Sequence, residues 1–345
     1  MGPRDTAGGS DVVTVAIVGA TGAVGAELLA VLERREFPVE RLVPMASARS
    51  VGTTVRFRGA DHPVVEAKAD AFAGVDVAFF SAGATRSRDL IPHARAAGAL
   101  VVDNSSAFRM DPSVPLVVPE VNPDALAGHD GVVANPNCVA AILTVAVAPL
   151  TKLGHVERLV ISTYQSASGA GARAMEDLLV QTADHLAGRE VVPRVLRHPF
   201  AFNLFSHDSA VEGNGYNGEE NKVVAELRKI LGMADLPVSV TCMRVPILRA
   251  HTATVNIEFD RAVSVEAARE AIAAADGVQL VDDPEANHFP MPNEASGKDD
   301  VLVGRVRLDP SRANTLNLLV SGDQLLKGAA LNAVQLAEAL RAAAS

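Results

Sequence analysis

The sequence predicts an α/β protein of two domains, a parallel-sheet domain followed by an α+β domain with a mixed, largely antiparallel sheet. Three observations support this prediction. The 345 residues exceed what one hydrophobic core usually serves. Short apolar runs alternate with helical stretches in the first half, which favours parallel strands joined by crossover helices. From residue 156 onward, β-forming residues alternate with polar ones, which is typical of half-buried strands.

The first half is expected to supply parallel strands with helices between them. Its apolar runs predict strands at 12–18, 41–46, 75–81, 100–103 and 114–118. Helical periodicity follows in 26–37, which ends in basic residues that suit a helix C-terminus, and again in 91–98. Residues 1–10 lack the apolar stretch of a signal peptide and are expected to form a flexible leader.

The second half is expected to combine a sheet with several helices. Alternating patterns predict strands at 156–164, 238–245, 252–259, 301–308 and 314–321. Helical patterns occupy 139–150, 173–186, 219–231, 264–275 and roughly 324–343.

Composition excludes several functional classes. The net charge is −10 with no Lys/Arg cluster, so neither nucleic acid nor an anionic membrane is expected as a partner. The longest apolar run, 138–150, is too short to span a bilayer. Two cysteines cannot form a disulfide framework, and no Cys/His grouping has the spacing of a zinc site, so no metal is expected. We expect a protein of a reducing compartment, the cytoplasm.

A glycine-rich turn joins the first expected strand to the first expected helix. Glycines at 19, 22 and 25 allow a tight turn and a close approach of a pyrophosphate to the positive end of the helix. A Rossmann-type dinucleotide-binding domain is therefore predicted. The alternative is that the glycines only form a turn between strand and helix and bind no nucleotide. The candidate cofactor-binding residues of the turn are Gly19, Thr21, Gly22, Ala23 and Val24.

The end of the second strand indicates which dinucleotide binds. An NAD site usually has an Asp or Glu here for the ribose 2′-hydroxyl. This chain has Ser47, Arg49 and Ser50 instead, and a guanidinium flanked by hydroxyls suits a 2′-phosphate. NADP is therefore the predicted cofactor; the alternative is that Arg49 is a solvated loop cation.

A cysteine at the start of an apolar helical stretch is the candidate nucleophile. Cys138 follows Asn135-Pro136-Asn137, so unpaired N–H groups and the helix dipole are expected to favour its thiolate. A lone cysteine beside an apolar run is more often a core thiol, and we interpret Cys242 in that way.

The chain resembles aspartate-β-semialdehyde dehydrogenase over nearly its whole length. The resemblance rests on eight motifs in the order of that family: GATGAVG, SARS, DNSSAFRMD, NPNC, YQSASGAG, NGYNGEENK, RVPILRAH and GDQLLKGAALNAVQ. It implies reduction of L-aspartyl-4-phosphate by NADPH to L-aspartate 4-semialdehyde and phosphate, the branch point toward lysine via diaminopimelate, threonine, methionine and isoleucine. Cys138 would displace phosphate to form a thioester, which hydride converts to a thiohemiacetal that releases the aldehyde.

The resemblance also implies the acid–base and carboxylate-binding residues. His251 matches the general acid–base residue, and Gln165 the residue that orients the acyl intermediate. Arg244 suits the substrate α-carboxylate, but its odd separation from His251 would place the two on opposite faces of a regular strand. The stretch between them must therefore bend, and Arg249 within it is expected to be structural.

Phosphate and ammonium recognition are assigned by the same resemblance. Glu219 and Lys222, three residues apart on one helix face, would bind the ammonium and the phosphate respectively. Arg109 matches the phosphate-binding arginine, and Asn137 would help to hold phosphate or the thioester oxygen. Glu220 competes with Glu219. The proposed site thus counts one carboxylate against three cations, which explains how an acidic protein binds an anionic substrate.

The remaining implications concern the cofactor and the domains. Ser168 and Gly169 would lie in a turn near the nicotinamide, and Gln324 would reach the cofactor. The nucleotide domain would comprise 1–137 plus 324–345, and 138–323 would form the catalytic domain and the face of a homodimer, or of a tetramer built from it.

Two other functions compete with this one. N-acetyl-γ-glutamyl-phosphate reductase shares the thioester chemistry, but its nucleophile motif has Gly in place of Asn137 and it lacks the EENK arrangement. An inactive or specialised NADP-binding paralogue is the other alternative, because the residues of segment 206–222 differ from those expected in the family. A glyceraldehyde-3-phosphate dehydrogenase is excluded by the NPNC and YQSASGAG motifs.

Overall fold

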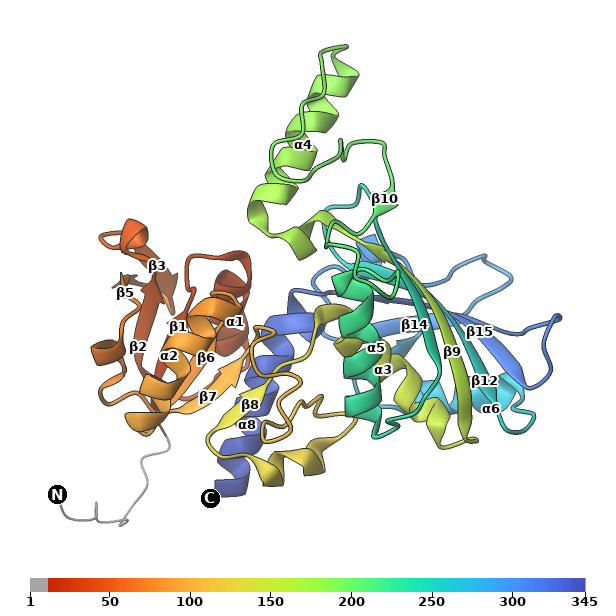
Figure 1. Cartoon of the computed structure of the whole chain (residues 1–345), viewed down its shortest axis with the longest axis horizontal. Helices are drawn as coiled ribbons and strands as arrows, with labels where there is room; N and C mark the ends of the chain where they lie inside the picture. Colours follow the sequence, from red (N-terminus) through yellow and green to blue (C-terminus); the bar gives the residue numbers. More distant parts are fainter. Residues whose placement is uncertain (1–11, 345) are drawn as a thin grey trace.

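The computed structural model describes residues 12–344, so the expected leader at 1–10 lies outside the described residues. Two β-sheets lie side by side with helices between them (Figure 1). The first sheet has six strands and the second has seven, and a short β3–β4 hairpin is separate from both.

The first sheet is entirely parallel, as the alternation of strands and helices predicts, with the order β5-β2-β1-β6-β7-β8. From the central strand β1 the chain continues to β2, which pairs with β1 on one side. The later strand β6 pairs with β1 on the other side. The crevice at the carboxyl ends of β1 and β6 is therefore the switch point at which ligands bind such sheets. The strands are β1 Val13–Val18, β2 Val39–Ala46, β5 Val65–Glu66, β6 Val77–Phe80, β7 Leu100–Asp103 and β8 Val132–Ala134.

The helices of this half are α1 Ala23–Arg34 and α2 Ala84–Ala96, and the hairpin strands are β3 Thr54–Phe57 and β4 Ala60–Pro63. The end of the chain returns to this sheet: α8 Leu331–Ala344 contacts α1 and β7. A π-helical turn, Leu326–Ala330, precedes α8.

One expected strand is wrong. The run 114–118 is buried, but it forms only an isolated bridge from Leu116 to Ala134 beside β8. Pro115 has no N–H to donate to a ladder, so its carbonyl alone accepts a bond, from Ala134 N at 2.9 Å.

The second sheet is mixed and largely antiparallel, as predicted, with the order β10-β11-β9-β12-β15-β14-β13. Only β11–β9 and β14–β13 pair in parallel. The strands are β9 Val156–Gln165, β10 Phe205–Ser206, β11 Val238–Arg244, β12 His251–Phe259, β13 Val278–Leu280, β14 Val301–Leu308 and β15 Thr315–Gly322.

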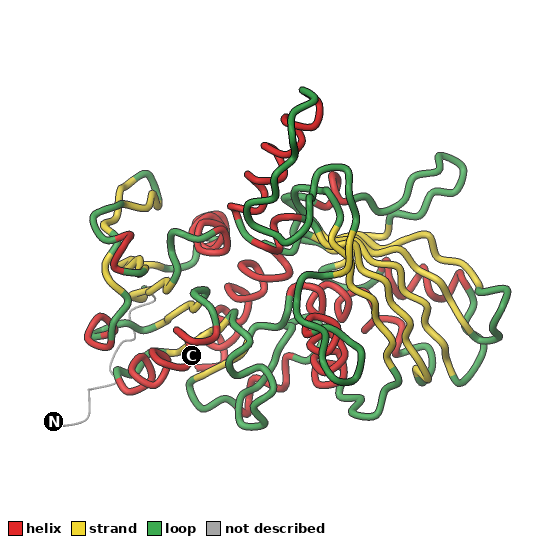
Figure 2. Tube along the Cα trace, turned by 45° about the horizontal axis from the view of Figure 1, so that its top comes forward, coloured by secondary structure: helices red, strands yellow, loops and turns green. Residues whose placement is uncertain are grey.

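Three helices pack on this sheet: α3 Cys138–Thr151, α5 Gly218–Leu231 and α6 Val265–Ala273 (Figure 2). Helix α3 is almost wholly apolar and buried, and it connects the last strand of the first sheet to the first strand of the second. Such a helix is hydrophobic all round because it is covered on every side. Its N-terminus, and hence Cys138, follows β8 of the first sheet after a short connection.

Helix α4 Ala172–Leu186 projects away from both sheets together with the segment that follows it (Figure 1). A one-turn helix, α7 Pro292–Ala295, contacts β15. No helix in the part of the chain that the structure describes is long and apolar enough to cross a membrane.

Candidate active site

The turn between β1 and α1 is tight because glycine occupies the positions at which a Cβ would clash. Gly19 has φ +98°, and a Cβ there would lie 2.9 Å from the carbonyl oxygen of Ser81, at the end of β6. A Cβ on Gly25 would lie 2.3 Å from the Gly19 oxygen. The turn thus fits closely between the ends of neighbouring strands, at the switch point of the sheet.

The N-terminus of α1 is left open. Gly22 is its N-cap, no side chain caps the first turn, and no acidic residue lies in it. Thr21 and Gly22 are exposed, so the first amides of the helix, which have no intrahelical acceptor, face outward. This cradle fits the pyrophosphate of a dinucleotide.

Arg49 lies in the short helical turn Ala48–Ser50 after β2, with Ser47 as its N-cap and Ser50 at its end. The Arg49 side chain is exposed and makes no hydrogen bond or ion pair within residues 12–344. A free guanidinium between two hydroxyls at the end of β2 matches the site expected for a ribose 2′-phosphate.

Cys138 is the first residue of α3, as predicted, and Asn137 is the N-cap. The Asn137 Oδ1 accepts bonds from the amides of Val139 and Ala140, and its Nδ2 donates to Glu219 Oε1 at 2.9 Å. Asn137 therefore caps the helix and binds a neighbouring carboxylate. The expected contact of Asn137 with phosphate or the thioester oxygen stays a prediction.

The thiol of Cys138 is half-buried, and Gly328 of the π-helical turn forms one wall beside it. A Cβ on Gly328 would lie 2.8 Å from the Cys138 Cβ. Burial, followed by the Glu219 carboxylate, raises the pKa of the Cys138 thiol to about 12, whereas Arg109, Arg244 and the Val139 amide lower it. The Val139 amide at the helix start therefore favours the thiolate, as expected, but burial and the Glu219 carboxylate outweigh it.

Glu219 is the centre of the polar network around the thiol. Its Oε1 accepts bonds from Asn137 and, at 3.2 Å, from Gln165 Nε2. Burial would raise the pKa of Glu219, but His207, Asn137, Lys222 and Gln165 together lower it below its ordinary value. Lys222 Nζ lies 3.7 Å from Glu219 Oε2, as their shared helix face predicts.

Glu220, the competing candidate, has a structural role. Its Oε2 completes a capping box with Asn217, and its Oε1 accepts the amide of Cys242 at 3.0 Å. Cys242 itself is fully buried in the core, as interpreted from the sequence.

Arg244 and His251 come together because the chain reverses between them. Arg244 ends β11, which runs parallel to β9, and His251 begins β12, which runs antiparallel to it. The turn includes Ala250 with φ +71°. Arg244 and His251 therefore lie on either side of Gln165, which ends β9. The chain between Arg244 and His251 bends, as their odd separation predicts.

Gly169 packs against both side chains. A Cβ there would lie 2.9 Å from the His251 ring and 3.2 Å from Arg244 Nη1. The turn Ala167–Ala170 thus closes over this end of the sheet.

Two buried donors at this point have no partner within the described chain, Arg244 Nη1 and His251 Nε2. Arg244 is held from the other side by Asp208, whose Oδ1 accepts from Nε at 2.8 Å. Burial, followed by Arg244, lowers the pKa of His251 to about 3. Since an unpaired buried polar group is costly, both donors are arranged for a bound molecule.

Arg109 is buried and bonded at each of its nitrogens. Nε donates to the Asn135 oxygen, Nη2 to the Asn104 oxygen, and Nη1 to Glu226 Oε1 at 3.1 Å. Glu226 is itself 1% exposed, and its Oε2 accepts the Asn137 amide at 2.5 Å. Glu226 therefore joins Arg109 to the residue that precedes the nucleophile.

Each predicted cation is paired with a carboxylate. The pairs are Arg109–Glu226, Lys222–Glu219 and Arg244–Asp208, at 3.1, 3.7 and 2.8 Å. The count of one carboxylate against three cations is therefore wrong, because it omits Glu226 and Asp208.

Gln324 and Ser168 face inward. The Gln324 Nε2 donates to Ser168 Oγ, and its Oε1 accepts the Ala250 amide at 3.0 Å. Both residues are buried, at 2% exposure each, so the side chain of Gln324 braces the histidine turn, and its expected reach to the cofactor stays a prediction. Arg249 is structural, as expected: it binds Glu27 of α1 and Asp323, each at 2.6 Å.

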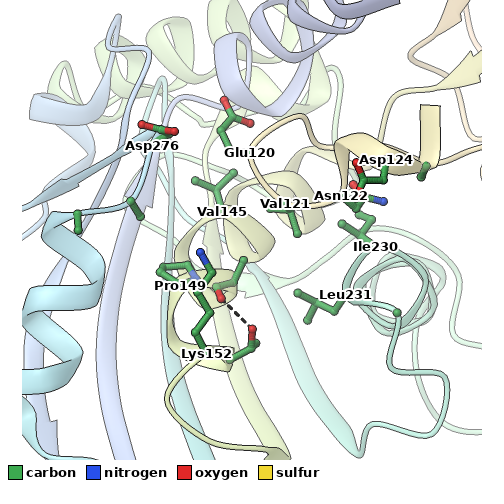
Figure 3. Close-up of a pocket in the computed structure, with 16 residues that line it drawn as sticks. Glu120, Val121, Asn122, Asp124, Val145, Pro149, Lys152, Ile230, Leu231 and Asp276 are labelled. Carbon is green, nitrogen blue, oxygen red and sulfur yellow. Dashed lines mark hydrogen bonds between the residues drawn. The ribbon is translucent and has the colours of Figure 1, made fainter. Parts of the chain in front are cut away.

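The opposite end of α3 lines a separate cavity of about 510 Å³ (Figure 3). Glu120 and Asp276 lie at one end of it, and Lys152 lines it at the C-cap of α3. This cavity contains none of the residues that the sequence singled out.

Comparisons with known proteins agree with this geometry. The semialdehyde dehydrogenase NAD-binding domain matches residues 14–129, and the semialdehyde dehydrogenase dimerisation domain matches 147–327. Aspartate-semialdehyde dehydrogenase of Synechocystis is 52% identical over 95% of this chain and 97% of its own length. The chain belongs to the aspartate-semialdehyde dehydrogenase family.

Other members of the family are also similar to this chain over nearly its whole length. The Bacillus subtilis enzyme is 45% identical, covering 95% of this chain and 97% of its own. The crystal structure of aspartate semialdehyde dehydrogenase II from Vibrio cholerae complexed with ASA has a TM-score of 0.93 at 41% identity, covering 96% of this chain and 98% of that one.

Sequence reasoning missed four residues of the site: Ser166, which contacts His251, and Asp208, Glu226 and Asp323. Only Glu226 had a usable signal, because it lies seven residues after Glu219 and hence on the same face of one helix.

Proposed function

We propose that the protein catalyses the reversible, NADPH-dependent reductive dephosphorylation of L-aspartyl-4-phosphate to L-aspartate 4-semialdehyde and phosphate. One observation carries the proposal: Arg244 Nη1 and His251 Nε2 are buried, unpartnered among the described residues, and located beside the network that surrounds the Cys138 thiol. A donor for a carboxylate and a donor for an acyl oxygen next to a nucleophile match an amino acid with an activated side-chain carboxyl group.

The residues then have distinct roles. Glu219 binds the substrate ammonium, and Arg244, oriented by Asp208, binds the α-carboxylate. Arg109 and Lys222 bind the phosphate, and Gln165 and His251 hold the acyl group. Cys138 forms the thioester, and bound NADPH supplies the hydride that reduces it.

Substrate binding changes the environment of the thiol. The Glu219 carboxylate is one cause of the raised pKa of Cys138. A substrate ammonium on Glu219 neutralises that charge, so the thiolate forms more readily when the substrate is present. Nucleophile activation is therefore coupled to recognition.

The cofactor and the domains are assigned on similar grounds. The open α1 N-terminus and Arg49 support NADP, with Gly19, Thr21, Gly22, Ala23 and Val24 at the pyrophosphate and Ser47, Arg49 and Ser50 at the 2′-phosphate. The contacts of α8 with α1 support a nucleotide domain of 1–137 plus 324–345, with 138–323 as the catalytic domain.

We further propose a homodimer formed through the second domain, whose family model is described as a dimerisation domain. A cytoplasmic location is consistent with the requirement that the Cys138 thiol stay reduced.

Phosphate-dependent reduction of NADP by L-aspartate 4-semialdehyde tests the function. Turnover should require phosphate and fall when NAD replaces NADP. Arg49→Ala should raise the KM for NADP about 10- to 100-fold, because a charge-assisted contact is lost. Arg56→Ala, on an exposed hairpin arginine paired with Asp61, is the matched control. A folded protein that binds NADP without turnover would favour the inactive paralogue, and preference for the N-acetyl-γ-glutamyl substrate would favour the reductase alternative.

A further inference from the structure

A buried carboxylate that no step of the proposed reaction uses lies between two residues of the site. Glu226 of α5 is 1% exposed, and each of its oxygens accepts a different donor. Oε1 accepts from Arg109 Nη1 at 3.1 Å, and Oε2 accepts from the Asn137 amide at 2.5 Å. Because a buried carboxylate is costly without such donors, the side chain holds Arg109 and the Asn137 amide in one fixed arrangement.

Arg109 keeps donors for a ligand after its contacts with the protein are made. A guanidinium has five N–H groups, and three of those of Arg109 are used by Glu226 and by the backbone oxygens of Asn104 and Asn135. One N–H on Nη1 and one on Nη2 remain, which is enough for two oxygens of a phosphate. Glu226 is the only carboxylate in ion-pair contact with Arg109 within residues 12–344.

Glu226 belongs to a charged face of α5. Four charged residues of this helix are three or four positions apart, and hence on one face. They are Glu219, Lys222, Glu226 and Lys229. Lys229 Nζ donates to the backbone oxygens of Arg109, Asp111 and Val114 at 2.8, 2.8 and 3.0 Å. One helix face therefore holds both the side chain and the backbone of the loop that carries Arg109.

The same carboxylate reaches the nucleophile. Asn137 is the N-cap of α3, and Cys138 is the next residue. Arg109 is near enough to Cys138 to lower the pKa of its thiol, although burial and Glu219 outweigh it. The bonds from Glu226 thus set the distance between the guanidinium and the turn that carries the sulfur.

We propose that Glu226 is the positioning residue for phosphate: its two bonds orient Arg109 relative to the Asn137–Cys138 turn, so that the phosphate of the substrate lies beside the sulfur that displaces it. The inference rests on the function proposed above. Glu226 acts through Arg109 and the Asn137 amide, and it is therefore distinct from the residues that touch the substrate.

Both oxygens of a carboxylate are needed for this role. Glutamine at position 226 has one acceptor oxygen, and its NH₂ group would face either the Arg109 guanidinium or the Asn137 N–H. Glu226→Gln must therefore lose one of the two bonds while the volume of the side chain is nearly unchanged.

Protection of Cys138 by inorganic phosphate measures this positioning without turnover. The full-length protein is alkylated with iodoacetamide at increasing phosphate concentrations, and mass spectrometry separates the Cys138 peptide from that of Cys242. Glu226→Gln should raise the phosphate concentration for half-protection about 10-fold or more, because a charge-assisted contact is lost or misaligned. The KM for phosphate in NADP reduction should rise by a similar factor, whereas the KM for NADP should change less than about twofold.

Glu220→Gln is the matched control, because Glu220 is a second buried carboxylate of α5 and serves the capping box. It should leave half-protection within about twofold of the wild type. Equal changes in Glu220→Gln and Glu226→Gln, or unchanged half-protection in Glu226→Gln, overturn the proposal. Absence of protection in the wild type overturns it as well, because phosphate then does not lie beside the sulfur.

Two further results complete the test. Circular dichroism checks that Glu226→Gln is folded; if it is not, Glu226→Asp is measured instead and should also raise half-protection, because its shorter side chain cannot reach both donors. If phosphate protects Cys138 in a Glu226-dependent manner but L-aspartate 4-semialdehyde is not turned over, the proposed substrate fails and the role of Glu226 stands.

Discussion

Helices α1 and α3 both begin directly after strands of the same parallel sheet, yet their N-termini have opposite surroundings. At α1 no side chain caps the amides and no acidic residue lies in the first turn. At α3 Asn137 caps the amides, and Glu219 and Glu226 bind its side chain and its backbone N–H. The dipoles of the two helices are similar, so the neighbouring side chains decide what each terminus binds.

The N-termini of α1 and α3 are therefore suited to different roles. Open amides at α1 are available to a permanent anion such as a pyrophosphate. At α3 the carboxylates offset the dipole, and burial raises the pKa of the thiol to about 12. Because the thiolate is the form that oxidants and alkylating agents attack, the raised pKa makes the Cys138 thiol less reactive toward them.

Replacing the proposed nucleophile at the start of α3 should have the largest effect. It changes the α3 N-terminus and leaves the α1 N-terminus as it is. Cys138→Ser should lower phosphate-dependent turnover by about 10³-fold or more, because a hydroxyl cannot replace the thiol in thioester formation. The Kd for NADP, measured by calorimetric titration, should be unchanged, since the α1 turn is untouched. Cys242→Ala, in the core, is the control; equal loss of turnover in both variants would contradict the assignment.

Closing the α1 turn should give an intermediate effect. A Cβ on Gly25 would lie 2.3 Å from the Gly19 oxygen, so Gly25→Ala must distort the phosphate cradle. We expect NADP affinity to fall about 100-fold, with the pH dependence of Cys138 alkylation unaltered. Gly128→Ala, where a Cβ meets nothing within 4 Å and φ is not positive, should leave affinity unchanged. Unchanged affinity in Gly25→Ala would show that the turn does not hold the cofactor.

Removing one carboxylate at α3 should give the smallest effect. Glu219 raises the pKa of Cys138, so Glu219→Gln should lower it and shift the alkylation profile to lower pH by about one unit. Glu220→Gln, whose carboxylate serves the capping box, should not shift the profile. A profile that moves to higher pH in Glu219→Gln would mean that the carboxylate assists thiolate formation.

Local patterns predicted most of the fold because hydrophobic periodicity is a property of short segments. The strand at 100–103 has the predicted limits, and α4, α5 and α6 lie within a few residues of the predicted helices. The error at 114–118 has a local cause as well: the run is apolar and buried, but Pro115 interrupts its hydrogen bonding.

The candidate site was predictable in its motifs but not in its electrostatics. Nothing in the sequence distinguishes Asp208 among 41 acidic residues, and the position of Glu226 on the helix face of Glu219 does not reveal its partner. The pairing of these carboxylates with Arg244 and Arg109 depends on contacts between distant segments. For the same reason the thiol pKa was expected to fall and instead rises. Burial and a carboxylate from α5, both products of tertiary structure, outweigh the local helix start.

The position of Gly328 against Cys138 has a consequence for how the protein is made. A ribosome releases the N-terminal segments first, so the glycine turn, the thiol and the histidine strand all emerge before the wall that Gly328 provides. Helix α8, which covers α1 and β7, is synthesised after all of these segments. A nascent chain therefore carries every proposed catalytic residue before the segment that supplies this wall has been made.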